Sequence, residues 1–320
     1  MTADARRLSQ LIPGASLAGR VLVARGAVGA VAWMSAHRQR VLAAVRSEGW
    51  ALVRGLDVRE DPAFRVCIEA LGFPVAFDYG DLPLSVAPGA DGVFEVTPFP
   101  PEEAILFHHE GAHTPRAPRY ICFHCSVPAQ AGGETPMADS TEMLVHLPRA
   151  IRDSLAERGL RYRRSFVEGL DVPWQRFFGL TDPREVEARC DAQGIDARWQ
   201  PDGRLCIETR RPAIVAHPET GRPTFFNQIL LHHPACLDPE VREAFQLVLP
   251  AGETPRDVRF GDDSPIPDEW IDEILSAYLR VAITFAWQAG DIVVADNSAV
   301  AHSRRPYVGP RRHRVVMSRC

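Results

Sequence analysis

Short apolar runs broken by turn residues recur through the first and last thirds of the chain, and these runs predict β-strands. Predicted strands cover residues 50–56, 93–96, 105–108, 120–127, 282–287, 292–294 and 314–317. Apolar residues at helical intervals predict helices at 33–45, 61–71, 140–160, 182–190 and 268–280. For the second of these helices we expect Asp61 to be the N-cap and Pro62 the first helical residue.

The middle of the chain, residues 162–267, mixes short elements, with further candidate strands at 205–209, 213–217 and 224–227. Strands therefore flank a long insertion, without the regular strand–helix alternation of a parallel sheet. This order predicts a mainly β protein with flanking helices, built on a jelly-roll core. We expect one domain over residues 1–320. Within it, a helical segment covers about 1–48, and the insertion covers about 141–280 between the two halves of the core.

Composition narrows the class of protein. The 320 residues are 46% hydrophobic and 24% charged, as in ordinary globular proteins. The net charge of -5 argues against a nucleic-acid partner. No apolar stretch is long enough to cross a membrane, and no apolar run follows residues 1–7, so we expect neither a membrane span nor a signal peptide, and a cytoplasmic protein. The seven scattered cysteines predict reduced core thiols.

Two distant segments together supply a set of metal ligands. His108 and Glu110 stand at the end of a predicted strand, and His302 follows far along the chain. Side chains at i and i+2 of a strand share a face, so His108 and Glu110 should point the same way and His109 the other. Two imidazoles and one carboxylate suit a non-haem Fe(II) that keeps positions open for O2 and a cosubstrate.

Two further segments carry polar groups suited to a carboxylate ligand. Residues 131–140 include adjacent glycines, which let the backbone approach another group closely, and a threonine whose hydroxyl could donate to a carboxylate. A plain strand-to-helix turn capped by Ser140 is the simpler interpretation of that segment taken alone. Residues 309–317 are rich in arginine, whose planar fork binds carboxylates bidentately.

In this order, the segments resemble the taurine dioxygenase (TauD/TfdA) family of Fe(II)/2-oxoglutarate-dependent oxygenases, and most of all the branch typified by the syringomycin biosynthesis protein SyrP. The resemblance covers about residues 50–317. It is carried by motifs at residues 108–110, 131–140, 172–175, 225–227, 287–291, 296–297, 302–307 and 309–311.

The resemblance implies a double-stranded β-helix of the cupin-like jelly-roll type, with Fe(II), 2-oxoglutarate and O2 as its cofactor and cosubstrates. It assigns iron binding to His108, Glu110 and His302. Thr135 and Arg311 are implied as the residues that bind 2-oxoglutarate. A shift of one residue would select Arg312 in place of Arg311, and strand alternation makes the two exclusive.

The implied reaction is hydroxylation of an unactivated C–H bond in a small amino acid or derivative of a natural-product pathway, with succinate and CO2 as coproducts. Related halogenases lack the carboxylate, so Glu110 argues against chlorination. Desaturation, cyclisation and action on an aminoacyl thioester held by a carrier protein stay open as alternatives, as does a non-catalytic jelly-roll that binds a ligand.

Substrate contacts are expected from a small group of polar residues: His109, Asn227, Arg304 and Arg314. Counting Arg305 and Arg312, more arginines lie near His302 than the cosubstrate can use. We therefore expect the substrate carboxylate, or a thioester in its place, to point toward them. A free amino acid is favoured over a carrier-bound one because only one short basic cluster is visible in an acidic chain.

Overall fold

The structure is a computed structural model that describes residues 17–24, 29–75, 92–96, 99–250 and 253–319. Residues 1–7, from which the absence of a signal peptide is predicted, lie outside the described residues, as does Cys320. Part of the predicted N-terminal segment of about 1–48 is likewise outside them. No helix in the described ranges is both long and apolar enough to cross a membrane.

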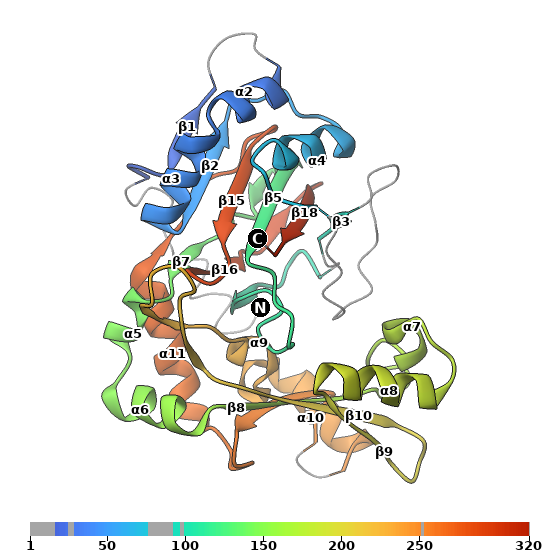
Figure 1. The fold of residues 1–320 in the computed structure, drawn as a ribbon. Helices are drawn as coiled ribbons and strands as arrows, with labels where there is room; N and C mark the ends of the chain where they lie inside the picture. The colour runs from blue at the N-terminus through green and yellow to red at the C-terminus, as the bar shows by residue number, and fades with distance from the viewer. Residues whose placement is uncertain (1–16, 25–28, 76–91, 97–98, 251–252, 320) are drawn as a thin grey trace.

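Two facing sheets form the centre of the molecule (Figure 1). The larger has the strand order β1 (Val21–Val23), β2 (Trp50–Arg54), β15 (Ile292–Asp296), β5 (Tyr120–Val127), β18 (Arg312–Ser318) and β3 (Val93–Glu95). The smaller has the order β14 (Ala282–Ile283), β7 (Met137–Asp139), β16 (Val300–Arg304) and β4 (Ile105–His108). Two short strands, β17 (Tyr307–Val308) and β6 (Ala131–Gly132), pair as a separate two-stranded sheet; β6 follows β5 and β17 follows β16 along the chain. The predicted jelly-roll core with flanking helices is confirmed.

Both faces of the larger sheet are buried, which explains why its strands are almost continuously apolar. Along β2, Ala51 and Val53 pack with helices α2 (Ala30–Ala36), α3 (Arg38–Glu48) and α4 (Asp61–Glu69). Trp50 and Leu52 point the other way, into the space between the two sheets. Successive side chains alternate between faces, so each strand contributes to two separate cores.

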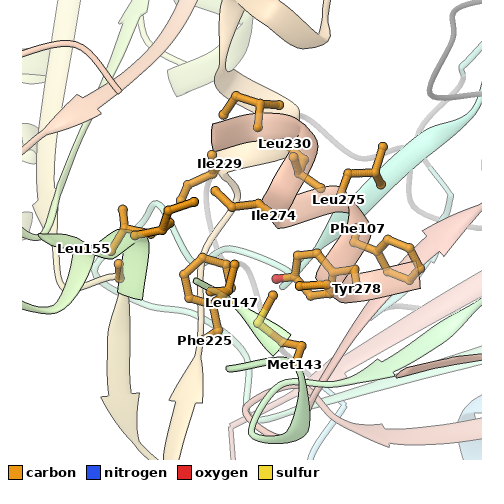
Figure 2. Packing of buried hydrophobic residues seen from close by; sticks show 14 of the residues in the cluster. Phe107, Met143, Leu147, Leu155, Phe225, Ile229, Leu230, Ile274, Leu275 and Tyr278 are labelled. Atoms are coloured by element: carbon orange, nitrogen blue, oxygen red, sulfur yellow. The ribbon is translucent and has the colours of Figure 1, made fainter. Parts of the chain in front are cut away.

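The smaller sheet is covered on its outer side by helices α5 (Glu142–His146), α6 (Arg149–Arg158) and α11 (Asp268–Val281). Figure 2 shows the core that they enclose, where Phe107 of β4 stacks on Tyr278 of α11 at 5.0 Å between ring centroids. Ile274 and Leu275 of α11 join the same core. The amphipathic pattern predicted for this helix therefore faces the sheet that carries His108 and His302.

The chain between β7 and β14 forms the insertion. Its own sheet has the order β13 (Arg256–Phe260), β8 (Leu160–Ser165), β10 (Leu205–Arg211) and β9 (Asp196–Trp199), and β11 (Ile214–Ala216) pairs with β12 (Pro223–Phe225). Helices α7 (Trp174–Phe178), α8 (Pro183–Gln193), α9 (Ile229–His232) and α10 (Pro239–Val248), and the 3-10 helix η1 (Pro234–Cys236), complete it.

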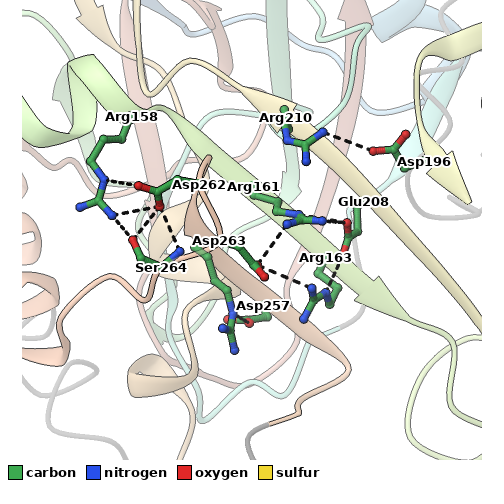
Figure 3. Close-up of polar contacts among 11 residues, drawn as sticks. Arg158, Arg161, Arg163, Asp196, Glu208, Arg210, Asp257, Asp262, Asp263 and Ser264 are labelled. Atoms are coloured by element: carbon green, nitrogen blue, oxygen red, sulfur yellow. Dashed lines mark hydrogen bonds and ion pairs between the residues drawn. The ribbon is translucent and has the colours of Figure 1, made fainter. Parts of the chain in front are cut away.

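One face of the insertion sheet is a network of ion pairs (Figure 3). Arg161 and Arg163 alternate with buried Tyr162 along β8, and both bind Glu208 of β10; the Arg163 Nε to Glu208 Oε1 distance is 2.7 Å. Asp263 approaches the same two arginines. These charges neutralise one another, so this arginine-rich strand does not present a basic surface.

Three predictions about helices were wrong in detail. Residues 140–160 form two helices and the start of β8, because Pro148 is extended and α6 begins after it. Residues 33–45 are divided between α2 and α3 at His37, whose ring binds the carbonyl of Trp33 at 2.9 Å. Asp61 is the first residue of α4 and makes no cap; its carboxylate accepts hydrogen bonds from arginines of β18 instead.

The six described cysteines are free thiols, as in a reduced core. Cys122 and Cys125 stand on opposite faces of β5 and are buried in different cores. Burial raises the pKa of the Cys125 thiol to about 12 and that of Cys122 further, so both stay protonated at neutral pH. Their C-x-x-C spacing therefore reflects two packed strand positions.

Candidate functional site

Two antiparallel strands of the smaller sheet bring His108 and His302 together. β16 pairs with β4 so that His302 lies directly opposite His108, and the two ring centroids are 4.2 Å apart. The hydrophobic pattern did not predict β16, whose Val-Ala-His-Ser-Arg sequence has no large apolar residue after Val300. The cross-strand register, rather than nearness in sequence, places the two imidazoles on one face.

Glu110 does not belong to the strand. β4 ends at His108, and Glu110 opens the turn that follows. Its backbone is held by buried Asn297, in the turn between β15 and β16: the Glu110 N–H donates to Asn297 Oδ1 and Asn297 Nδ2 donates to the Glu110 carbonyl, both at 2.9 Å. Asn297 Nδ2 also donates to the Pro118 carbonyl at 2.9 Å. A side-chain clamp thus replaces the strand ladder in positioning this carboxylate.

The three side chains can converge on one ion. Glu110 Oε2 is 3.9 Å from the Nε2 atoms of both His108 and His302, and the possible ligand atoms all lie within 4.8 Å of one another. His108 Nδ1 lies 2.8 Å from the Leu106 carbonyl and donates to it, which leaves the Nε2 lone pair facing Glu110. Burial, then the neighbouring His108, lowers the pKa of His302 well below its usual value, so His302 is neutral as a metal ligand must be. This donor set, of two buried imidazoles and one partly exposed carboxylate, fits Fe(II).

Substitution of Asn297 by alanine is expected to weaken iron binding by roughly 10- to 100-fold, the cost typical of losing an outer-shell partner. The substitution leaves both backbone groups of Glu110 without their side-chain partner, so the carboxylate loses its fixed position. Calorimetric titration of the metal-free protein with Mn(II) measures the effect. Asn297→Asp keeps the acceptor and loses the donors, so it should fall between. An unchanged Mn(II) affinity in Asn297→Ala would show that the turn at Glu110 keeps its conformation without the Asn297 side chain.

A pocket lined by both polar and apolar side chains contains the triad and lies between the two sheets. Its lining consists of Val96, Ile105, His108, Glu110, Phe123, Thr135, His302, Ser303, Arg304, Arg311, His313, Val315 and Met317. Thr135 Oγ1 accepts a hydrogen bond from Trp287 Nε1 at 3.1 Å. The threonine hydroxyl can therefore direct its own hydrogen toward an acceptor in the pocket, such as a carboxylate oxygen.

Arg311 and Arg312 have different surroundings. Arg311 Nε donates to the Gly133 carbonyl at 3.3 Å, and a Cβ at Gly133 would lie 3.1 Å from that nitrogen, so glycine permits the approach. Burial, reinforced by the charge of Arg304, lowers the pKa of Arg311 to about 10, which leaves the guanidinium charged at neutral pH. Arg312 is exposed and pairs with Asp61 at 3.3 Å. Of the two, only Arg311 lines the triad pocket.

The structure does not bring His109 and Asn227 to the pocket wall. His109 points away from the triad and is fully buried, with Nε2 at 2.6 Å from Ser140 Oγ and its ring against Phe226. Its backbone N–H donates to the Asn227 carbonyl, and Asn227 Oδ1 accepts from the Ile229 N–H. Burial lowers the pKa of His109 to about 3, so it is a neutral packing residue. These two residues join β4 to α9 instead.

The arginines expected to receive the substrate carboxylate have partners within the chain. Arg314 pairs with Asp61 at 3.0 Å and with Glu95 at 3.2 Å, and Arg305 pairs with Glu134 at 3.3 Å. Arg304 donates to the carbonyls of Phe99, Pro100 and Glu103. The sequence shows the cations but not these partners, which lie far along the chain. Of the four expected substrate residues, Arg304 alone lines the triad pocket.

Sequence reasoning gave no role to Asn297, Trp287 and His313. Asn297 and Trp287 stand in motifs that the family resemblance includes, so the sequence marks both positions but does not say what either side chain does. His313 lies between the arginines of the C-terminal cluster, and nothing in the sequence distinguishes its role from theirs. Its place on the inner face follows from its pairing with Cys125 of β5, whose side chain also packs between the two sheets.

Comparisons with known proteins show what this chain is similar to. The family model described as taurine catabolism dioxygenase TauD, TfdA family matches residues 21–320. The dapdiamide synthesis protein DdaC of Enterobacter agglomerans is 34% identical over 270 residues, which are 84% of this chain and 82% of that protein.

Two solved structures share the fold at low identity. PvcB of Pseudomonas aeruginosa aligns with a TM-score of 0.54 and 14% identity over 93% of this chain and 84% of its own. An asparagine oxygenase in complex with Fe(II), 3-hydroxyasparagine and succinate aligns with a TM-score of 0.53 and 14% identity, over 89% of this chain and 79% of its own.

Proposed function

The chain belongs to the TauD/TfdA family of dioxygenases, and from this premise we propose that it hydroxylates an unactivated C–H bond of an amino acid or amino-acid derivative in natural-product biosynthesis. It is an Fe(II)/2-oxoglutarate-dependent oxygenase. In the proposed reaction one oxygen atom of O2 enters the substrate and the other enters succinate, as 2-oxoglutarate loses CO2. Bound iron and 2-oxoglutarate supply this oxidising chemistry, and the protein supplies binding, orientation and exclusion of water.

The observation that carries the site assignment is the convergence of His108, Glu110 and His302 in one pocket with Thr135 and Arg311. We assign iron binding to the first three. Arg311 and Thr135 are assigned to the distal carboxylate of 2-oxoglutarate, because a charged fork and a hydroxyl with a free hydrogen both suit carboxylate oxygens. Apolar lining residues such as Phe123, Val315 and Met317 help to exclude water from the reacting atoms.

The substrate class rests on the likeness to DdaC, whose name places it in dapdiamide synthesis, and on the fold shared with an asparagine oxygenase. The SyrP-like branch stays a prediction. Among the expected substrate residues, Arg304 is the one we retain for contact with substrate, since it lines the pocket and its buried Nε has no hydrogen-bond partner among the described residues.

A free substrate is favoured over one bound to a carrier protein. The described arginines near the pocket, Arg304, Arg305, Arg312 and Arg314, are bound to carbonyls or carboxylates of the chain itself. An acidic carrier surface would need an exposed basic rim, and its association would weaken with salt. The paired arginines do not provide such a rim.

A panel of free amino acids, assayed against the same residues loaded on a carrier protein, tests this proposal. We expect succinate release and a product that has gained one oxygen atom from a free amino acid or a simple derivative. A product that has lost two hydrogens would point to desaturation or cyclisation. Turnover of loaded residues alone, with rates that fall as salt rises, would contradict the preference for a free substrate.

A further inference from the structure

His313 is a buried polar side chain for which the assignments above give no task. It is 2% exposed, and neither ring nitrogen has a hydrogen-bond partner among the described residues. Buried polar groups are nearly always paired, because leaving one unpaired costs its desolvation free energy. A buried imidazole with two unpaired nitrogens on a pocket wall is therefore available to bind a ligand.

His313 lies near Arg311 and Thr135, the two residues that we assign to the distal carboxylate of 2-oxoglutarate. His313, Val315 and Met317 of β18 line the triad pocket, two residues apart as strand alternation requires, and Arg311, which also lines it, immediately precedes the strand. The His313 ring packs edge-on against Trp287 at 4.8 Å between centroids, and Trp287 donates to Thr135. His313 thus lies next to the groups that we assign to one carboxylate.

The protonation state of His313 suits a hydrogen-bond donor. Burial, followed by the nearby charge of Arg311, lowers the pKa of His313 well below its usual value, so the ring is neutral at pH 7. A neutral imidazole carries one N–H donor and one acceptor nitrogen. It can therefore stand beside the Arg311 guanidinium without like-charge repulsion and still offer an N–H to an anion.

We propose that His313 donates an N–H hydrogen bond to the distal carboxylate of 2-oxoglutarate and completes a three-residue cradle with Arg311 and Thr135. The inference rests on the proposed function, since it takes the same pocket as the cosubstrate site. His313 also lines an outer cleft with Arg304, Arg311 and Tyr307, so it stands where that cleft meets the pocket. A hydrogen bond from His313 at this point favours a cosubstrate whose distal carboxylate extends from the metal site as far as His313.

The test compares two ligands that differ in the distal carboxylate. Calorimetry on Mn(II)-loaded protein without O2 measures the affinity for 2-oxoglutarate and for oxalate, which chelates a metal but has no distal carboxylate. In His313→Phe we expect the Kd for 2-oxoglutarate to rise by about 10- to 150-fold, the range for losing a hydrogen bond to a charged group. The Kd for oxalate should stay within about twofold. His313→Gln, which keeps a donor, should recover part of the lost affinity.

His124→Phe is the matched control. His124 is also buried, on the neighbouring strand β5, but its Nε2 binds the Val58 carbonyl at 3.0 Å and its ring packs against Phe64 on the far face of the sheet. This variant should leave both affinities unchanged. Equal losses for 2-oxoglutarate and oxalate in His313→Phe, or no loss for either, would overturn the proposal. Failure of the wild-type protein to bind Mn(II) and 2-oxoglutarate would instead overturn the proposed function.

Discussion

Replacement of His302 by alanine is expected to remove detectable turnover and to reduce iron affinity by more than the roughly 10- to 100-fold typical of losing an outer-shell partner. In the proposed site His302 supplies one of three donor atoms, and its opposite neighbour on β4, His108, cannot replace it because the Nε2 of His108 already serves as a second donor. His108→Ala and Glu110→Ala should behave alike. Metal titration and succinate release measure the two effects.

The control for this prediction is His233→Ala. His233 is equally buried, but it follows α9 and its Nε2 binds the Ile266 carbonyl at 3.0 Å, away from the triad. This variant should lose stability while it keeps its iron affinity. Full activity of purified, iron-loaded His302→Ala protein would show that the imidazole is not a ligand and that the triad is assigned wrongly.

Replacement of Arg311 by alanine is expected to raise the Kd for 2-oxoglutarate by roughly 30- to 4,000-fold, which corresponds to the roughly 2–5 kcal/mol lost when one partner of a buried charge pair is removed. The guanidinium borders the pocket and stays charged at neutral pH. Arg311→Lys keeps the charge but not the planar fork, so it should recover only part of the affinity. Anaerobic titration with 2-oxoglutarate, followed by the absorption band that it produces with bound iron, gives the Kd.

The variant Arg312→Ala tests whether Arg311 or the next residue, Arg312, binds 2-oxoglutarate. The Arg312 side chain is 50% exposed, and its partner Asp61 keeps Arg314, so little should change in either stability or cosubstrate affinity. A larger loss of 2-oxoglutarate affinity in Arg312→Ala than in Arg311→Ala would show that the strand register is shifted by one residue.

Local sequence signals predicted most of the core strands but not the pairing that makes the site. Strands such as β5 and β15 are strongly apolar because both their faces are buried, and such runs are visible in sequence. β16 is short and carries a histidine at its centre, so no apolar pattern marks it; His302 was predicted as a metal ligand from its residue type and from the family resemblance, without the strand that carries it. The break at Pro148 was visible in sequence, yet apolar spacing continued across it and predicted one helix.

The sequence predicts which types of residue form the site. It does not predict what each arginine does, because that depends on partners far away along the chain. Arg314 is expected at a ligand from sequence alone, but Asp61 and Glu95, both far along the chain, bind it in the fold. The position of Glu110 was predicted on the assumption that β4 continues to it. The strand stops at His108, and a distant asparagine fixes the carboxylate instead.

Under the proposed metal assignment, the pairing of β4 with β16 also determines when during biosynthesis the complete set of iron ligands can form. A nascent chain on the ribosome displays His108 and Glu110 long before His302 exists, and two donors alone hold iron weakly. The third donor arrives only with β16, and Asn297, which fixes Glu110, arrives in the turn just before it. Non-local strand pairing is slow compared with local folding, so the last strands of the sheet also set the pace of assembly. Under the proposed assignment, the full set of three donors is therefore present only once β16 has paired with β4.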